Sequence, residues 1–187
     1  MAYNIKDVFY LSTSVTTKAT TTGGGSSQLD LSAYIDPIQR GRAKGTGLAV
    51  YKVHWMFNDD TQSNPVDPAE TGVICFQLQA GAGVGDNETG DYTLDNSEGL
   101  ATNALLVSGG SYYAPSASVG GSQSPHMENM INPSTEVPYV IVRDNVCLTY
   151  DIKDQFTDKQ IISCRLEVAQ ISLDQATLNQ LLRTQTV

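Results

Sequence analysis

Basic residues are scarce in this chain. Its 187 residues include 11 lysines and arginines against 20 aspartates and glutamates, which gives a formal net charge of −9 at pH 7. Broad nucleic-acid binding needs a concentrated surplus of cations to neutralise phosphates. The chain also lacks a basic strip interleaved with aromatic residues, the pattern typical of single-strand binding. We therefore expect no strong direct contact with nucleic acid.

Catalytic and metal-binding motifs are missing as well. Only two histidines, His54 and His126, are available to act as a base, and there is no G-x-S-x-G sequence. The zinc spacings C-x-x-C and H-E-x-x-H are absent. Acidic residues in loops could still form a carboxylate pair of the glycosidase type, but none can be named as a catalyst. We predict that the protein is not an enzyme.

The chain has three cysteines, an odd number: Cys75, Cys147 and Cys164. Each lies in an apolar, strand-like run, so we expect small buried hydrophobic residues in a reducing compartment. The start, MAYNIKDVFYL, has no basic region followed by an apolar one, and no apolar run approaches the roughly 18 residues that span a membrane. We therefore expect no signal peptide, no transmembrane segment and folding in a cytoplasm.

What the chain does contain is alternation of apolar and polar residues, which is typical of half-buried β-strands. In GLAVYKVHWMF (47–57), every second residue from Ala49 to Phe57 is apolar. Residues 97–108 fit either a helix or a short strand at 104–108. The remaining strands are predicted over residues 7–17, 28–35 and 72–79, and as three successive strands within 137–173.

The C-terminal part of the pattern gives three more specific predictions. Residues 137–143 are apolar on both faces, which indicates a central strand. Asp144 and Asn145 between apolar runs indicate a tight hairpin. Ser172 followed by Gln175 matches a capping box, which predicts a short C-terminal helix.

One domain over residues 1–187 is expected, with long loops at about 58–71, 80–99 and 111–135. The run TTTGGGSS (20–27) is predicted to be a further flexible loop. We expect no cofactor. A loose calcium site in the acidic 86–98 loop is the alternative, because spaced carboxylates suit a hard cation, although the EF-hand order is not met. Its candidate ligands are Asp86, Glu88, Asp91, Asp95 and Glu98.

Two segments are candidates for contacts between subunits. The stretch 111–135 has no periodicity but carries more apolar side chains than a solvated loop needs, so we expect it to pack on something. The stretch 40–44 holds the only local basic cluster, which suits the acidic surface of a neighbouring subunit. The predicted interface residues are Arg40, Arg42, Lys44, Tyr112, Tyr113, Met127, Met130 and Ile131.

Together these patterns predict an all-β chain: an antiparallel, jelly-roll-like β-sandwich of about eight strands with a short C-terminal helix. The layout resembles the small single-jelly-roll capsid proteins of icosahedral viruses. The resemblance is carried by LDLSAYIDP (29–37) leading into residues 47–57, and by PYVIVRDNVCLTYDI (138–152) leading into the last strand. It involves no diagnostic motif, and the basic arm that many small capsid proteins carry for the genome is missing.

The resemblance implies a structural virion protein: a capsid subunit that self-assembles into a shell through loop and terminal contacts. Its partners would be further copies of itself and other virion proteins. It would be found in the virion after synthesis in the host cytoplasm. The alternative is a lectin-like β-sandwich that presents Tyr112, Tyr113 and acidic loops to a glycan or protein ligand.

Overall fold

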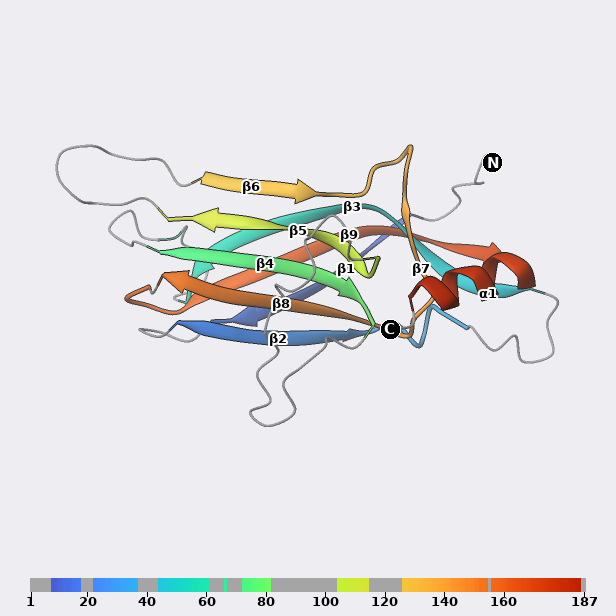
Figure 1. Ribbon diagram of the computed structural model, residues 1–187, viewed down its shortest axis with the longest axis horizontal. Helices are drawn as coiled ribbons and strands as arrows, with labels where there is room; N and C mark the ends of the chain where they lie inside the picture. The colour runs from blue at the N-terminus through green and yellow to red at the C-terminus, as the bar shows by residue number, and fades with distance from the viewer. Residues whose placement is uncertain are drawn as a thin grey trace.

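The computed structural model describes residues 8–17, 22–36, 44–60, 66, 72–81, 104–114, 126–154 and 156–185. In this part of the chain, two antiparallel sheets pack face to face, and a short helix lies at one end (Figure 1). Sheet A contains, in spatial order, β1 (Phe9–Thr16), β9 (Gln160–Leu173), β3 (Gly45–Asp59) and β7 (Tyr139–Ile141). Sheet B contains β2 (Gly23–Asp30), β8 (Asn145–Asp154), β4 (Val73–Ala80), β5 (Leu106–Tyr113) and β6 (His126–Ile131).

The strand order is that of a jelly roll. Consecutive strands alternate between the two sheets, except that β4, β5 and β6 follow one another in sheet B. The first strand pairs with the last, from Phe9 opposite Val168 to Thr16 opposite Ile161. Without β6, each sheet has four strands in the order expected for two interlocked Greek keys. The predicted fold class is therefore confirmed, and β6 is an additional strand on one edge of sheet B.

The core lies between the sheets and includes a chain of aromatic rings that joins them. Phe76 of β4 is fully buried, and its ring centroid lies 4.5 Å from that of Trp55 and 5.0 Å from that of Phe57, both on β3. The ring of Phe57 in turn stacks on Tyr112 of β5 at 4.5 Å. Aromatic pairs at these distances add directional attraction to the burial of apolar surface. The predicted single apolar face of residues 47–57 is therefore only partly confirmed. A bulge between Val50 and Lys52 shifts the register, so Trp55 and Phe57 pack in this core whereas Ala49 and Tyr51 pack in a separate cluster.

The three successive strands predicted within 137–173 are present, but the predictions that the first is central and that a hairpin joins it to the second are wrong. β7 has only three residues, forms the edge of sheet A and does not pair with β8, which lies in sheet B. Val142 is buried because it packs with Leu173 and with Leu178 of the helix, and not because a central strand covers it. The side chain of Arg143 donates to the carbonyl oxygen of Gln185 just beyond that helix. The predicted hairpin is therefore a crossover between the sheets.

The predicted loop at 20–27 and strand at 28–35 also need correction, because β2 begins at Gly23 and ends at Asp30. The phenol ring of Tyr150 on β8 lies 2.7 Å from where a Cβ on Gly25 would be, so glycine allows that close approach. After Leu31 the chain turns, and the amide of Ile35 donates to the carbonyl oxygen of Leu31 at 3.1 Å. Of the residues that alternation places inward, Leu31 and Ile35 are buried, but Ala33 is exposed because it lies in this turn.

Residues 111–135 do not form one long loop. Their ends belong to the β5–β6 pair and to the segment that follows it, while residues 115–125 lie outside the described part of the chain. Of the helix and the short strand left open for residues 97–108, the described residues form the strand, as β5 (Leu106–Tyr113). Of the other predicted loops, residues 58–59 belong to β3 and Ala80 to β4, and most of the rest lies outside the described residues.

The helix α1 (Gln175–Thr184) begins two residues later than a cap at Ser172 would place it. Its N-cap is Asp174, whose Oδ1 accepts the backbone N–H of Thr177 at 2.7 Å. That hydrogen bond, with a smaller contribution from the charge of Lys44, lowers the pKa of Asp174 below its ordinary value. No helix within the described residues has the length and apolar content needed to cross a membrane.

Candidate functional site

β6 extends sheet B past the edge of sheet A (Figure 1). On that side, β7 covers β3 only from Leu48 to Val50, so the opposite end of β3 is the edge of sheet A. Met127 of β6 pairs with the buried Tyr112 and therefore lies on the inner face of sheet B, yet 42% of it is exposed. An inward side chain stays exposed here because no strand of sheet A lies opposite it.

We define the β6 edge as Tyr113, His126, Met127, Glu128 and Asn129. All five are exposed, and no strand of the described chain pairs with the outer side of β6. The ring of Tyr113 stacks near His126, with centroids 6.3 Å apart, and Nε2 of His126 lies 3.5 Å from Oε1 of Glu128. The β6 edge therefore combines apolar surface, free backbone groups and only one carboxylate.

Side-chain hydrogen bonds hold β6 in place against sheet A. Oδ1 of Asn132, just after β6, accepts the N–H of Val53 at 3.0 Å, and its Nδ2 donates to the Val53 carbonyl oxygen at 2.9 Å. The indole N–H of Trp55 donates to Oγ of Ser108, which donates in turn to the carbonyl oxygen of Ile131. These contacts give an edge strand a fixed position, which a specific docking surface requires.

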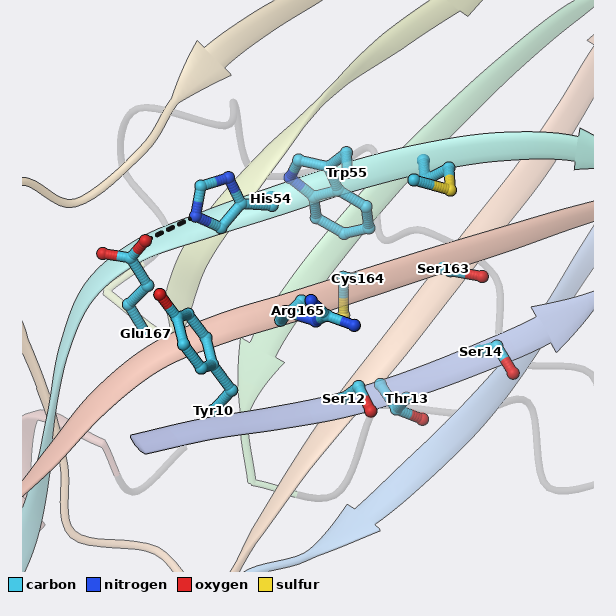
Figure 2. Close-up of a pocket in the computed structure, with 11 residues that line it drawn as sticks. Tyr10, Ser12, Thr13, Ser14, His54, Trp55, Ser163, Cys164, Arg165 and Glu167 are labelled. Carbon is cyan, nitrogen blue, oxygen red and sulfur yellow. Dashed lines mark hydrogen bonds and ion pairs between the residues drawn. The ribbon is translucent and has the colours of Figure 1, made fainter. Parts of the chain in front are cut away.

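A second surface feature is an open depression of about 750 Å³ on the outer face of sheet A, across β1, β9 and β3. Figure 2 shows the guanidinium of Arg165 beside the ring of Tyr10, and the dashed bond between His54 and Glu167. The Arg165 Cζ atom lies 5.8 Å from the Tyr10 ring centroid, and Nε2 of His54 lies 2.7 Å from Oε1 of Glu167. Ser12 faces Arg165 from β1. We call this surface the sheet A depression.

The predicted interface residues differ in their position and in how exposed they are. Tyr112 is buried in the core, with 7% exposure, so it presents little surface to a partner and forms no platform with the outward-facing Tyr113. Tyr113 and Met127 are exposed neighbours on the β6 edge, and Ile131 is half-buried at its end. Lys44 is exposed near the start of α1. Arg40, Arg42 and the side chain of Met130 lie outside what the structure describes.

Sequence patterns point only weakly to these surfaces. The additional strand β6 (HMENMI) shows no regular alternation of apolar and polar residues. A bulge between its pairs with Gly109 and Gly110 also shifts its register. The sheet A depression is formed by strands distant in sequence that present polar side chains outward. Only the pairing of β1, β9 and β3 brings these side chains together.

No group of three or more histidines, cysteines and carboxylates able to hold a metal ion is found within the described ranges. The calcium ligands suggested by the sequence, at 86–98, lie outside those ranges. All three cysteines are free. Cys147 and Cys164 lie on successive strands, β8 and β9, which belong to different sheets. Burial raises the pKa of the Cys164 thiol to about 12.

This burial predicts a simple pattern of thiol reactivity. At pH 8 we expect only the half-buried Cys75 to react rapidly with a disulfide reagent in the native protein, because Cys147 and Cys164 are buried. With a pKa of about 12, the thiolate fraction of Cys164 at pH 8 is roughly one in ten thousand. In denaturant all three thiols should react. Two or more rapidly reacting thiols in the native protein would contradict the burial of Cys147 and Cys164.

Comparisons with known proteins find similarity only among solved structures. No protein-family model matches the chain, and a search of curated proteins gives no match. VP1 of Trichodysplasia spinulosa-associated polyomavirus, in complex with sialylated precision glycooligomers, is 7% identical, with 92% of this chain and 97% of that chain covered and a TM-score of 0.42. The same protein in complex with GM1 oligosaccharide gives 7% identity, coverages of 90% and 96% and a TM-score of 0.41.

A third structure of this VP1 is 8% identical, with coverages of 91% and 98% and a TM-score of 0.38. The matched protein is viral. Because all three TM-scores are below 0.5, the jelly-roll assignment rests on the strand order of the chain itself.

Proposed function

We propose that this protein is a capsid subunit that self-assembles into a shell, and that the β6 edge is one of its subunit contacts. The observation that carries the proposal is the inward-facing Met127 of β6, which is 42% exposed beyond the end of sheet A. A strand with an unpaired edge and apolar side chains is a ready site for a second chain. β6 contains neither lysine nor proline, the residues that commonly protect an edge from pairing.

Charge also favours contact between copies at this surface. A chain with a net charge of −9 repels its copies in general, so a self-contact needs a surface with little net charge. On the β6 edge the single carboxylate, Glu128, lies beside His126. A specific interface buries on the order of 1,000 Å² or more, which one short strand does not provide. We therefore retain the predicted loop and terminal contacts, including Arg40, Arg42 and Lys44, as further parts of the interface.

The experiment is to express the chain and examine it by size-exclusion chromatography with light scattering and by negative-stain microscopy. We expect rings, shells or other large closed assemblies, since one repeated contact with closed symmetry produces such forms. The substitution Met127→Asp should raise the concentration needed for assembly by about tenfold or more, because each contact would then bury an unpaired charge.

Met56→Asp is the matched control. Met56 is 62% exposed, but it lies on the outer face of sheet A, away from the β6 edge. The Met56→Asp variant should assemble as the unchanged chain does. A strictly monomeric wild-type protein would overturn the proposed function. Equal loss of assembly in both variants would show that the β6 edge is not a specific subunit contact.

The remaining parts of the proposal follow from the capsid role. The protein would act without catalysis and reside in the virion with other virion proteins, after synthesis in the host cytoplasm. The scarcity of basic residues supports genome packaging by other components.

A further inference from the structure

We propose that the sheet A depression binds an acidic sugar, with Arg165 holding the ring carboxylate. The proposal is independent of assembly through the β6 edge, because the depression lies on the outer face of the other sheet. The outer face of sheet A is also the more accessible of the two, because Tyr10, His54 and Arg165 on it are exposed. On the central strands of sheet B, the outward side chains of Gln77, Gln79 and Thr149 are buried.

Arg165 is a cation without a counter-ion among the described residues. No carboxylate among the described residues lies at ion-pair distance from Arg165. Glu167 lies two positions along β9, but its carboxylate is hydrogen-bonded to His54 at 2.7 Å. Lys52 faces Glu167 from β3 and adds a second cation to this part of the sheet. Two cations against one carboxylate make a local positive surface on a chain whose net charge is −9. Such a surface attracts an anionic ligand.

The guanidinium of Arg165 is held in a geometry that suits a carboxylate. Its Cζ atom lies 5.8 Å from the centroid of the Tyr10 ring, within range of a cation–π contact that restricts its orientation. A planar guanidinium with fixed orientation suits a carboxylate, which it binds through two parallel hydrogen bonds. Tyr10 is 60% exposed, so much of its ring is available to the apolar C–H face of a pyranose.

Serine hydroxyls surround Arg165 and supply hydrogen-bonding groups. Ser12 lies directly opposite Arg165 on β1, and Ser14 lies opposite Ser163 two pairs further along. These hydroxyls have no hydrogen-bond partner among the described residues, and a hydroxyl both donates and accepts, as the hydroxyls of a sugar do. Together with the charge and the ring, they favour a sugar acid over a simple carboxylate.

The size of the depression agrees with a small sugar. Neighbouring strands lie about 4.8 Å apart, so the row Ser12–Arg165–His54 across β1, β9 and β3 spans roughly 10 Å. The volume of about 750 Å³ falls in the range of small-molecule sites. This width accommodates one or two pyranose rings.

The test is titration calorimetry of the full chain with the methyl glycosides of glucuronic and galacturonic acid. The probes for comparison are the neutral methyl glucoside and galactoside, which lack the carboxylate, and acetate, which lacks the ring. We expect at least one acidic glycoside to bind about tenfold or more tightly than its neutral counterpart and than acetate. Arg165→Gln should weaken that binding about tenfold or more, and Tyr10→Ala should weaken it several-fold.

Arg183→Gln, which removes a cation in the last turn of α1, is the control for net charge and should bind as the unchanged chain does. Arg165→Lys keeps the charge but not the planar fork, and should recover only part of the affinity lost in Arg165→Gln. Equal affinity for acetate, equal affinity for the neutral sugars, or full binding by Arg165→Gln would each overturn the proposal. So would a change of oligomeric state in Arg165→Gln, because Arg165 would then serve a subunit contact.

Discussion

Replacing Gly110 with alanine is expected to displace β6 from β5 and to abolish assembly while the rest of the sandwich stays folded. A Cβ at this position would overlap the backbone carbonyl oxygen of Glu128 and lie 2.9 Å from its carbonyl carbon. Backbone atoms cannot move aside as a flexible side chain can, so β6 itself must shift. Overpacking of this kind costs about 1–3 kcal/mol, and here the cost falls on one edge strand.

Hydrogen exchange measures this displacement directly. Amide protection in β6 should fall roughly tenfold to a hundredfold in Gly110→Ala, because local opening becomes easier by that free energy, while β8 and β9 keep their protection. Ser111→Ala is the matched control, since Ser111 is the next residue of β5 and its side chain bonds only to Cys75. It should retain both protection and assembly. If Gly110→Ala assembles normally with β6 protected, the placement of β6 against β5 is wrong.

Phe76→Ala should produce the largest loss of stability among single substitutions in the core. Phe76 is fully buried and contacts Trp55 and Phe57 across the interface between the sheets. Truncation of a buried phenylalanine costs about 3–5 kcal/mol, because burial is lost and a cavity remains. A domain of this size is stabilised by roughly 5–15 kcal/mol in total. The midpoint of thermal unfolding should fall by about 10 °C.

This measurement needs a monomeric background, because assembly stabilises the folded chain by mass action. Urea unfolding of Phe76→Ala should therefore be compared with its parent in the Met127→Asp chain, at concentrations where both are monomers. Met56→Ala, at an exposed position, should change the free energy of unfolding by less than about 0.5 kcal/mol. A loss below about 1 kcal/mol for Phe76→Ala would show that the sheets do not pack through this ring.

The sequence predicts the fold class well, because alternation is a local property that strand formation preserves. Leu31 and Ile35 are confirmed as core, and so are the residues from Val53 to Phe57 that were predicted to face inward. The bulge after Val50 is not visible as a local pattern, and it moves Ala49 and Tyr51 into a separate cluster. The predictions of strand pairing are less accurate, because pairing depends on residues far apart in the sequence. The sequence of residues 137–152 does not indicate that β7 and β8 belong to different sheets. The apolar Val142 suggests a strand buried on both faces, but Val142 is buried by the helix.

The candidate site is harder to predict for a similar reason. Gly25 lies in a run of three glycines that indicates a loop, but it is part of β2 because it allows the ring of Tyr150 to approach. Tyr112 and Tyr113 look equivalent in the sequence, whereas adjacent residues of a strand face opposite sides, and only Tyr113 is exposed. Arg165 does not stand out in the sequence as a site residue, because its Tyr10 and Ser12 neighbours are supplied by the other end of the chain.

The pairing of β1 with β9 also has a consequence for synthesis. Phe9 finds its partner only at Val168, so the N-terminal strand has no native edge to join until most of the chain has left the ribosome. Contacts between residues so far apart in sequence slow folding and leave apolar strands exposed meanwhile. Sheet A therefore cannot be completed before β9 has been synthesised, and the exposed strands are expected to need protection from chaperones during that interval.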